Sequence, residues 1–326
     1  MSNKLKYRPY ETRDIKSIIG LWEHHSGFGG IDEKTFEDWY VKTPYEPAEI
    51  IVAEDEENKV RAQMVFMPTR IRVGEQVIKG MRIAAPIIDR DIRFSDTDFL
   101  AHPLFNLFMN GMLQSKRKGF ALVYIFPARG WLTVLDKFSH LVNNWLTASF
   151  PTFSIEVGST IINPTGSPGF FYKEAEAFTE QYDELWEKAI RDLPIICGIE
   201  KKKDWLTFRL SQHIIIEARD KDNGELKGYC VINRKSGMII DLLATSQSDL
   251  KEILFGTLDT LVQMNKQEVV MEGKLTGMYT DLMAKILEGE HIEFPDYKID
   301  FGCTLLDKNI SAESIKLSNW YMMPDL

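Results

Sequence analysis

Cationic and polar side chains surround the loop that precedes an amphipathic helix predicted to begin at Pro103. Arg90 and Arg93 could each bind a phosphate through paired N–H donors, and Ser95 and His102 lie in the same loop. The N-terminus of a helix adds unsatisfied backbone N–H groups and the positive end of the helix dipole, which attract anions. The sequence therefore predicts an anion site at the start of this helix.

The same loop also has a structural interpretation. Three aspartates lie within residues 90–99, and each would repel a phosphate by roughly 1 kcal/mol at about 4 Å in water. They could instead pair with Arg90 and Arg93 on a solvated surface, and His102 could simply cap the helix. The loop contains no glycine, whose missing Cβ lets backbone N–H groups close around a phosphate. Both interpretations remain open at the level of sequence.

A carboxylate at the end of an apolar strand is a candidate general base. Glu54 follows the run Glu49–Ala53 and could accept a proton from an amine, directly or through water, although an ordinary surface charge would occupy the same position. Other catalytic patterns are missing from the sequence, which has no Walker loop, no GxSxG and no HExxH. The three cysteines form no CxxC and have no nearby histidine pair, so no metal site is predicted.

Length and charge limit the classes of partner. The chain has 326 residues, about twice the usual domain size, so two domains are expected. Its net charge of −9 disfavours nucleic-acid binding and is compatible with an amine or polycationic substrate. No run approaches the roughly 18 apolar residues of a membrane span, and no signal peptide is predicted. Scattered cysteines favour a reducing compartment, so the expected location is the cytoplasm.

Strand and helix signals in the first half follow a definite order. Apolar runs joined by short turns predict an antiparallel meander, with strands at Glu49–Ala53, Val60–Met67, Ile71–Ile78 and Ile83–Ile88. A helix over 103–117 follows, with a predicted buried stripe of Leu104, Phe105, Leu107, Phe108, Met112 and Leu113. The apolar run Ala121–Phe126 then predicts a short strand that is covered on both faces.

The second half repeats this order. Two predicted strands flank the turn Lys221–Gly224, which is a strong hairpin signal. Further predicted elements are a strand, a helix, a strand, a helix and a strand, at Gly237–Ala244, Gln247–Met264, Glu268–Glu272, Thr276–Leu287 and Ile299–Leu306. Proline and glycine cluster in residues 151–176 and suggest a boundary. The prediction is an α+β chain of two domains, 1–152 and 153–326, each a mostly antiparallel mixed sheet flanked by helices.

Several short motifs in this order resemble the GNAT N-acetyltransferase superfamily, in particular bacterial members with two such domains in tandem. Tyr7-Arg8-Pro9 with Asp14 is similar to the opening of many members, and Val52-Ala53-Glu54 is similar to an early strand. Phe126-Pro127 with Lys137-Phe138 resembles the segment after the later strand. In the second half, Asp204–Arg209 and Gly224–Tyr229 look like the corresponding segment of the tandem proteins. The resemblance covers most of the chain.

The resemblance implies an acyl-CoA-dependent transfer, with acetyl-CoA as co-substrate and a small-molecule or peptide amine as acceptor. The strands Ile83–Ile88 and Ala121–Phe126 would be parallel and splayed, and would hold the pantetheine arm by backbone hydrogen bonds. Glu54 would serve as the base and Tyr124 as the acid for the leaving thiolate, although Tyr124 could equally pack in the core. The implied cofactor-binding residues are Ile87, Ile88, Asp89, Arg90, Arg93, Ser95, His102 and Pro127.

Two other functions fit the same resemblance. The glycine-free loop and the lack of a tyrosine within Gly130–Lys137 would suit a catalytically inactive binding or scaffold protein. Aminoacyl transfer of the peptidoglycan-bridge type also uses two such domains, but it requires a charged tRNA, which the acidic net charge disfavours. A homodimer is a possible assembly, and neither nucleic acid nor membrane is an expected partner.

Overall fold

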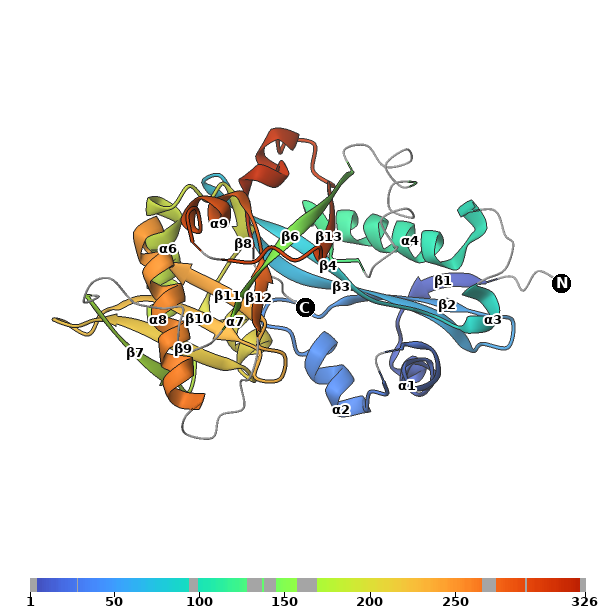
Figure 1. Cartoon of the computed structure of the whole chain (residues 1–326). Coiled ribbons are helices and arrows are strands. Elements are labelled where there is room, and N and C mark those ends of the chain that lie inside the picture. Colours follow the sequence, from blue (N-terminus) through green and yellow to red (C-terminus); the bar gives the residue numbers. More distant parts are fainter. Residues whose placement is uncertain are drawn as a thin grey trace. The chain divides into compact units, whose positions relative to one another are not determined.

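The computed structural model describes residues 5–27, 29–93, 99–127, 137, 145–156, 169–265, 274–290 and 292–322 (Figure 1). Its contacts divide the chain into two compact units. The N-terminal unit comprises Met1–Ile71, Val77–Thr147 and Gly302–Ala312, and the C-terminal unit comprises Arg72–Gln76, Ala148–Phe301 and Glu313–Leu326. The predicted domain limits of 1–152 and 153–326 stay a prediction. No helix among the described residues is long and apolar enough to cross a membrane.

The N-terminal unit is built on a mixed, mostly antiparallel sheet whose strands lie in the order β1-β2-β3-β4-β5-β13. The strands are β1 Lys6–Pro9, β2 Glu49–Glu54, β3 Val60–Val73, β4 Gln76–Ile88, β5 Leu122–Ile125 and the end of β13 Lys298–Leu305. The helices are α1 Ile15–His25, α2 Glu33–Phe36, α3 Arg90–Arg93 and α4 Pro103–Arg117. This arrangement confirms the predicted fold class.

Helix α4 covers one face of this sheet, and α1 and α2 cover the other (Figure 1). Alternate residues of the strands, such as Ile51 and Met64, pack with Leu107 and Phe108 of α4 in one buried cluster. Helix α4 begins at the predicted residue, since proline at the first position loses no helical hydrogen bond. Its predicted stripe is wrong at Leu113, which is 50% exposed because it lies beside the buried face rather than on it.

The predicted pair of strands at Val60–Met67 and Ile71–Ile78 is wrong. Strand β3 continues through Pro68, and the turn lies at Gly74, which has φ +58°. Pro68 is tolerated because the pairing of β2 with β3 already ends at Glu49 and Phe66, so the missing N–H interrupts no bond in that ladder. Glycine suits the turn because it adopts positive φ without a Cβ penalty.

The C-terminal unit contains a four-stranded antiparallel sheet in the order β11-β10-β9-β7. These strands are β7 Phe170–Ala175, β9 Ile214–Asp220, β10 Leu226–Ile232 and β11 Ile239–Ala244. The predicted hairpin is confirmed, with Gly224 at φ +73°. The helices of the unit are α6 Gln181–Asp192, α7 Lys203–Leu210, α8 Gln247–Asn265 and α9 Asp281–Ile286.

Helices α6 and α8 cover opposite faces of this sheet. Tyr229 of β10 contacts Tyr182 of α6, whereas a Cβ at the preceding residue, Gly228, would meet Ile253 of α8. Successive strand residues face opposite sides, so the two helices must lie on opposite faces. Both layers pack into one core that includes Trp186, Leu254 and Leu258.

Further strand pairs of the C-terminal unit include β6 with its neighbours β12 and β13, and β8 with β14. Antiparallel β12 pairs with β6, and parallel β14 pairs with β8, where the strands are β6 Leu146–Glu156, β8 Cys197–Ile199, β12 Lys274–Met278 and β14 Trp320–Tyr321. The predicted helix start at Thr276 is therefore wrong, because Thr276 belongs to β12 and pairs with Ser154 of β6. Helix α9 begins later, after the Thr280 cap. The predicted strand Glu268–Glu272 lies outside the described residues.

Candidate functional site

Strands β4 and β5 run parallel but pair over only four residues. Their register extends from Gly80 opposite Leu122 to Ile83 opposite Ile125, which confirms the predicted parallel pair. Strand β4 then continues to Ile88 without β5. The divergence coincides with Ala85, a non-glycine residue at φ +45°, where a left-handed backbone costs roughly 1–3 kcal/mol.

The residues beyond the last pair are half-buried, and they come from β4 and from the chain directly after β5. They are Ala84, Ala85, Pro86, Phe126 and Pro127. Backbone N–H and C=O groups along a strand edge need partners, and an extended ligand can supply them. Pro86 offers no N–H, so the donors of this stretch of β4 belong to the residues on either side of it. The divergence is therefore a surface suited to an extended, amide-containing ligand.

Ile87 and Ile88 end β4 beside this surface. Their side chains are only 1% and 3% exposed, so a ligand could reach their backbone but not their side chains. Pro127 is half-buried and lies two residues beyond the last β4–β5 pair. Ser95 lies outside the described residues. The cofactor-binding roles of Ile87, Ile88 and Pro127 stay predictions.

Asp89 is held inside the protein rather than presented to a ligand. Its carboxylate accepts a bond from Arg61 Nε at 2.8 Å and one from the N–H of Asp91 at 3.0 Å. Burial opposes ionisation of Asp89, but these two donors outweigh it, and the pKa of Asp89 lies below its usual value. Asp89 therefore anchors the short helix α3 to β3.

The two arginines of the predicted anion loop have different environments. Arg93 Nη2 donates to the backbone carbonyls of His25 and Ile88, both at 3.0 Å, so this guanidinium already links three segments. Arg90 presents an exposed side chain, while its backbone N–H donates to His25 Nδ1 at 3.1 Å. Of the pair, Arg90 is the one whose side chain a ligand could reach.

His102 caps helix α4. The N–H of Leu104 donates to His102 Nδ1 at 3.2 Å, so this ring nitrogen is unprotonated, and Nε2 therefore carries the proton that is donated to the carbonyl of Arg93 at 3.0 Å. The imidazole satisfies the first orphan N–H of the helix and ties it to α3. The N–H of Asn106 donates to the carbonyl of His102 at 3.2 Å, so this donor of the first turn is also used within the protein.

Glu54 is part of a buried ionic cluster. Arg8 donates from Nε and Nη2 to Glu54 at 2.9 and 2.8 Å, and from Nη1 and Nη2 to Asp14 at 2.7 and 2.8 Å. These bonds from Arg8 hold the pKa of Glu54 below its ordinary value, and they raise that of Arg8. A carboxylate held in this way is a weak base, so the contacts favour a role in joining β1, β2 and the start of α1.

Tyr124 lies on β5 between Arg82 of β4 and Cys303 of β13 in the strand register. Its side chain is fully buried, and its ring meets Phe126 edge-on at 6.1 Å. The phenol is therefore buried in the protein interior, and the proposed acid role of Tyr124 stays a prediction.

A buried amide that the sequence analysis overlooked lies on the same face of the sheet as Glu54. Gln63 of β3 is opposite Val52, which is opposite Arg8. Gln63 is 0% exposed, and neither its Oε1 nor its Nε2 has a hydrogen-bond partner among the residues that the structure describes. Each unsatisfied buried polar group costs about 1–3 kcal/mol. The sequence signal that could have identified Gln63 is a single amide within the apolar run Ala62–Met67. Gln63 is therefore a candidate binding residue.

Comparison with known proteins identifies the fold of this chain. No protein-family model matches the chain, and no curated protein matches it in sequence. Solved structures do match it. The GCN5-related N-acetyltransferase of Anabaena variabilis superposes with a TM-score of 0.66 at 13% identity, covering 93% of this chain and 73% of that one. The chain has the fold of the GCN5-related N-acetyltransferases.

Two further solved structures share this N-acetyltransferase fold. The GCN5-related N-acetyltransferase of Kribbella flavida has a TM-score of 0.62 at 15% identity, over 94% of this chain and 72% of its own. Eis1 of Mycobacterium abscessus has a TM-score of 0.61 at 10% identity, over 93% and 74%. At these identities the likeness establishes the fold, and function must be argued from the site.

Proposed function

We propose that the protein is an acyl-CoA-dependent N-acyltransferase that transfers an acetyl group to a primary amine. The observation that carries this proposal is the parallel β4–β5 pair that ends at Ile83 and Ile125, followed by a half-buried divergence at a distorted β4. An extended pantetheine arm with two amides matches the backbone groups of such an edge. The N-acetyltransferase fold supports the same assignment.

The chain's own residues would act by positioning. Backbone groups of β4 near Ala85 would bind the arm, and Arg90 with the start of α4 would attract the phosphates. The amine would then attack the thioester directly, without a covalent enzyme intermediate. Gln63, whose amide has no partner in the described part of the chain, is proposed to orient groups at this surface.

A catalytically inactive binding protein is the second candidate. The engagement of Arg93 with two backbone carbonyls and of Glu54 with Arg8 favours it, because these contacts make two candidate functional groups less available to a substrate. The two candidates differ in turnover. An inactive protein would bind acetyl-CoA without releasing CoA when amines are added.

Calorimetric titration of acetyl-CoA into the full chain tests the proposal, with desulfo-CoA and ADP as controls. We expect binding in the micromolar range, that is roughly −8 kcal/mol, together with CoA release in the presence of an amine panel. Arg90→Ala should weaken binding, whereas Arg117→Ala, which removes an exposed arginine at the opposite end of α4, should not. Absence of heat with all three ligands would reject the proposal.

A further inference from the structure

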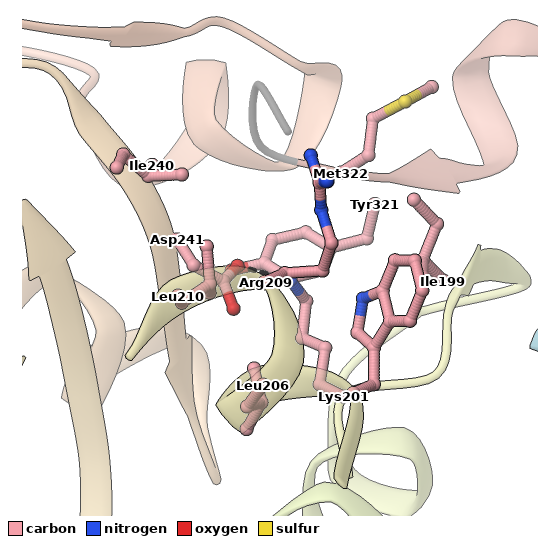
Figure 2. Close-up of a pocket in the computed structure, with 10 residues that line it drawn as sticks. Ile199, Lys201, Leu206, Arg209, Leu210, Ile240, Asp241, Tyr321 and Met322 are labelled. Atoms are coloured by element: carbon pink, nitrogen blue, oxygen red, sulfur yellow. Dashed lines mark hydrogen bonds and ion pairs between the residues drawn. The ribbon is translucent and has the colours of Figure 1, made fainter. Parts of the chain in front are cut away.

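A pocket beside α7 in the C-terminal unit is largely filled by its own side chains (Figure 2). Lys201 donates to Asp241 within it, and Tyr229 donates to the second oxygen of the same carboxylate at 2.6 Å. The remaining cavity of about 20 Å³ has room for a single water molecule. This pocket therefore cannot hold an organic ligand, and a partner of the unit would bind elsewhere on its surface.

Strand β7 forms an open edge of the four-stranded sheet in the same unit (Figure 1). It pairs with β9 on one side, and no described residue pairs with its other side. At the opposite edge of this sheet, a bridge between Met238 and Thr276 connects the start of β11 to β12. Strand β7 therefore presents a row of backbone donors and acceptors that the described part of the chain leaves unused.

The backbone hydrogen bonds of β7 alternate between β9 and the open side. The N–H of Lys221 donates to the carbonyl of Gly169 at 2.8 Å, and these two residues continue the antiparallel register of β7 with β9. In an antiparallel pair, every second residue of a strand bonds to the same neighbour. Bonds to β9 therefore come from the odd-numbered residues of β7. The groups on the open side belong to three residues, Phe170, Tyr172 and Glu174.

Strand β7 has few of the features that usually protect an edge. Its register with β9 runs without a bulge, and its six residues include no proline. Its one lysine, Lys173, lies 3.5 Å from Glu217 of β9, so this charge is directed toward its own sheet. Phe171 is 40% exposed, whereas Tyr172, on the other face, donates to the carbonyl of Glu252 in α8 at 3.1 Å. An exposed aromatic side chain beside unused backbone groups is typical of an interface.

A second copy of β7 fits this edge best in one antiparallel register. A two-fold axis perpendicular to the sheet keeps each side chain on its own face, so the axis must lie at the level of one residue. An axis at Tyr172 places Tyr172 opposite its own copy and Phe170 opposite Glu174 of the second copy. Each of these opposite pairs can exchange two backbone hydrogen bonds, because all of the groups lie on the open side.

Neighbouring positions of the axis are less favourable. An axis at Lys173 or at Glu174 would bring two like charges directly opposite each other, which is destabilising. An axis at Phe171 would leave Glu174 without an opposite residue in the strand. Charge and hydrogen bonding therefore select the register centred on Tyr172.

We propose that β7 is a dimerisation edge, at which a second copy of this chain adds its own β7 and joins the two four-stranded sheets into one. Phe171 of each copy would then lie opposite Lys173 of the other, on the face away from α8. The aliphatic stem and the ammonium of lysine can both pack on an aromatic ring, so this pair would cover the exposed side chain. The inference does not rest on acyl transfer, because β7 belongs to the C-terminal unit and the proposed acyl-CoA surface to the N-terminal one.

Analytical ultracentrifugation of the full chain over about 1–100 μM measures the association. We expect monomer and dimer in equilibrium in the micromolar range, because one strand edge is a small interface. Glu174→Pro removes an N–H on the open side without removing a donor to β9, and it should weaken association about tenfold or more. Glu174→Ala is the matched control, because it removes the same side chain but keeps the N–H, and it should associate like the unchanged chain.

Cysteine cross-linking tests the register and does not depend on the folding of Glu174→Pro. Phe171→Cys mixed with Lys173→Cys should form a disulfide-linked dimer faster than either variant alone, because the register places one of these residues opposite the other. The native cysteines, Cys197, Cys230 and Cys303, are buried and should not react. A monomer throughout the concentration range, equal association of Glu174→Pro and Glu174→Ala, or faster cross-linking of either cysteine variant alone would overturn the proposal.

Discussion

The packing of α4 against the sheet can be tested at Gly111. This residue lies in the middle of α4, and a Cβ added there would overlap the ring of Phe66, which is 0% exposed. Alanine in a helix interior gains about 1 kcal/mol over glycine, whereas inserting atoms into a packed core costs about 1–3 kcal/mol. Since a ring buried on all sides cannot rotate away freely, the cost should lie near about 3 kcal/mol. After the gain of about 1 kcal/mol, we expect Gly111→Ala to reduce the free energy of unfolding by about 2 kcal/mol.

Gly20 provides the matched control. It lies inside α1 in the same unit, and no heavy atom of the described residues outside the local helix backbone lies within 4 Å of an added Cβ. Gly20→Ala should therefore raise the free energy of unfolding by about 0.5–1 kcal/mol. The two variants should differ by about 3 kcal/mol, or roughly a hundredfold in the unfolding equilibrium.

Urea denaturation followed by circular dichroism measures both variants, with the midpoint compared at constant slope. Adding Phe66→Leu to Gly111→Ala should recover part of the loss, because the smaller side chain makes room for the new methyl group. If Gly111→Ala proved as stable as Gly20→Ala, the close approach of α4 to β3 would be refuted.

Three other outcomes follow from the described contacts. Gln63→Leu should raise the free energy of unfolding by about 1–2 kcal/mol, because it removes two polar atoms that the described residues leave unsatisfied, and it should slow acyl transfer. A loss of stability would show that the amide has a partner. His102→Ala should cost about 1 kcal/mol in urea unfolding through loss of the α4 cap, and Asn at this position should restore most of it. The pKa of Glu54 is lowered from 4.5, so the contribution of its ion pair is complete above that pH and is lost as the pH falls through the lowered value. Glu54→Gln should therefore reduce stability near neutral pH and flatten its decline toward about pH 3, and an unchanged pH profile would contradict the assignment.

Local signals predicted the elements that position the candidate site. The periodic apolar residues of α4 and Pro103 at its first turn determine where that helix begins, and the short apolar run Leu122–Ile125 is typical of a buried parallel strand. These features depend on neighbours a few residues apart. They therefore remain visible without any knowledge of the tertiary structure.

The roles of individual polar residues depended on long-range contacts. Arg8 and Glu54 are separated by 46 positions, and Arg93 finds its acceptor at His25, 68 positions away. No periodicity encodes such pairs, so these contacts could not be predicted, and the proposed roles of Glu54 and Arg93 stay predictions. Pro68 was expected to end a strand because proline usually does so. Strand β3 nevertheless continues through Pro68, because the pairing of β2 with β3 has already ended at Phe66.

The return of β13 to the N-terminal unit has a consequence for biosynthesis. Gly302–Leu305 pair with Ile125–Leu122 of β5, so this edge of the sheet receives its partner only after about 180 further residues have been translated. At 5–20 residues per second, the apolar strand β5 waits roughly 10–40 s on the ribosome without that neighbour. An uncovered apolar strand can pair with other chains. Expression at lower temperature or with a chaperone that protects nascent strands should therefore increase the yield of folded protein.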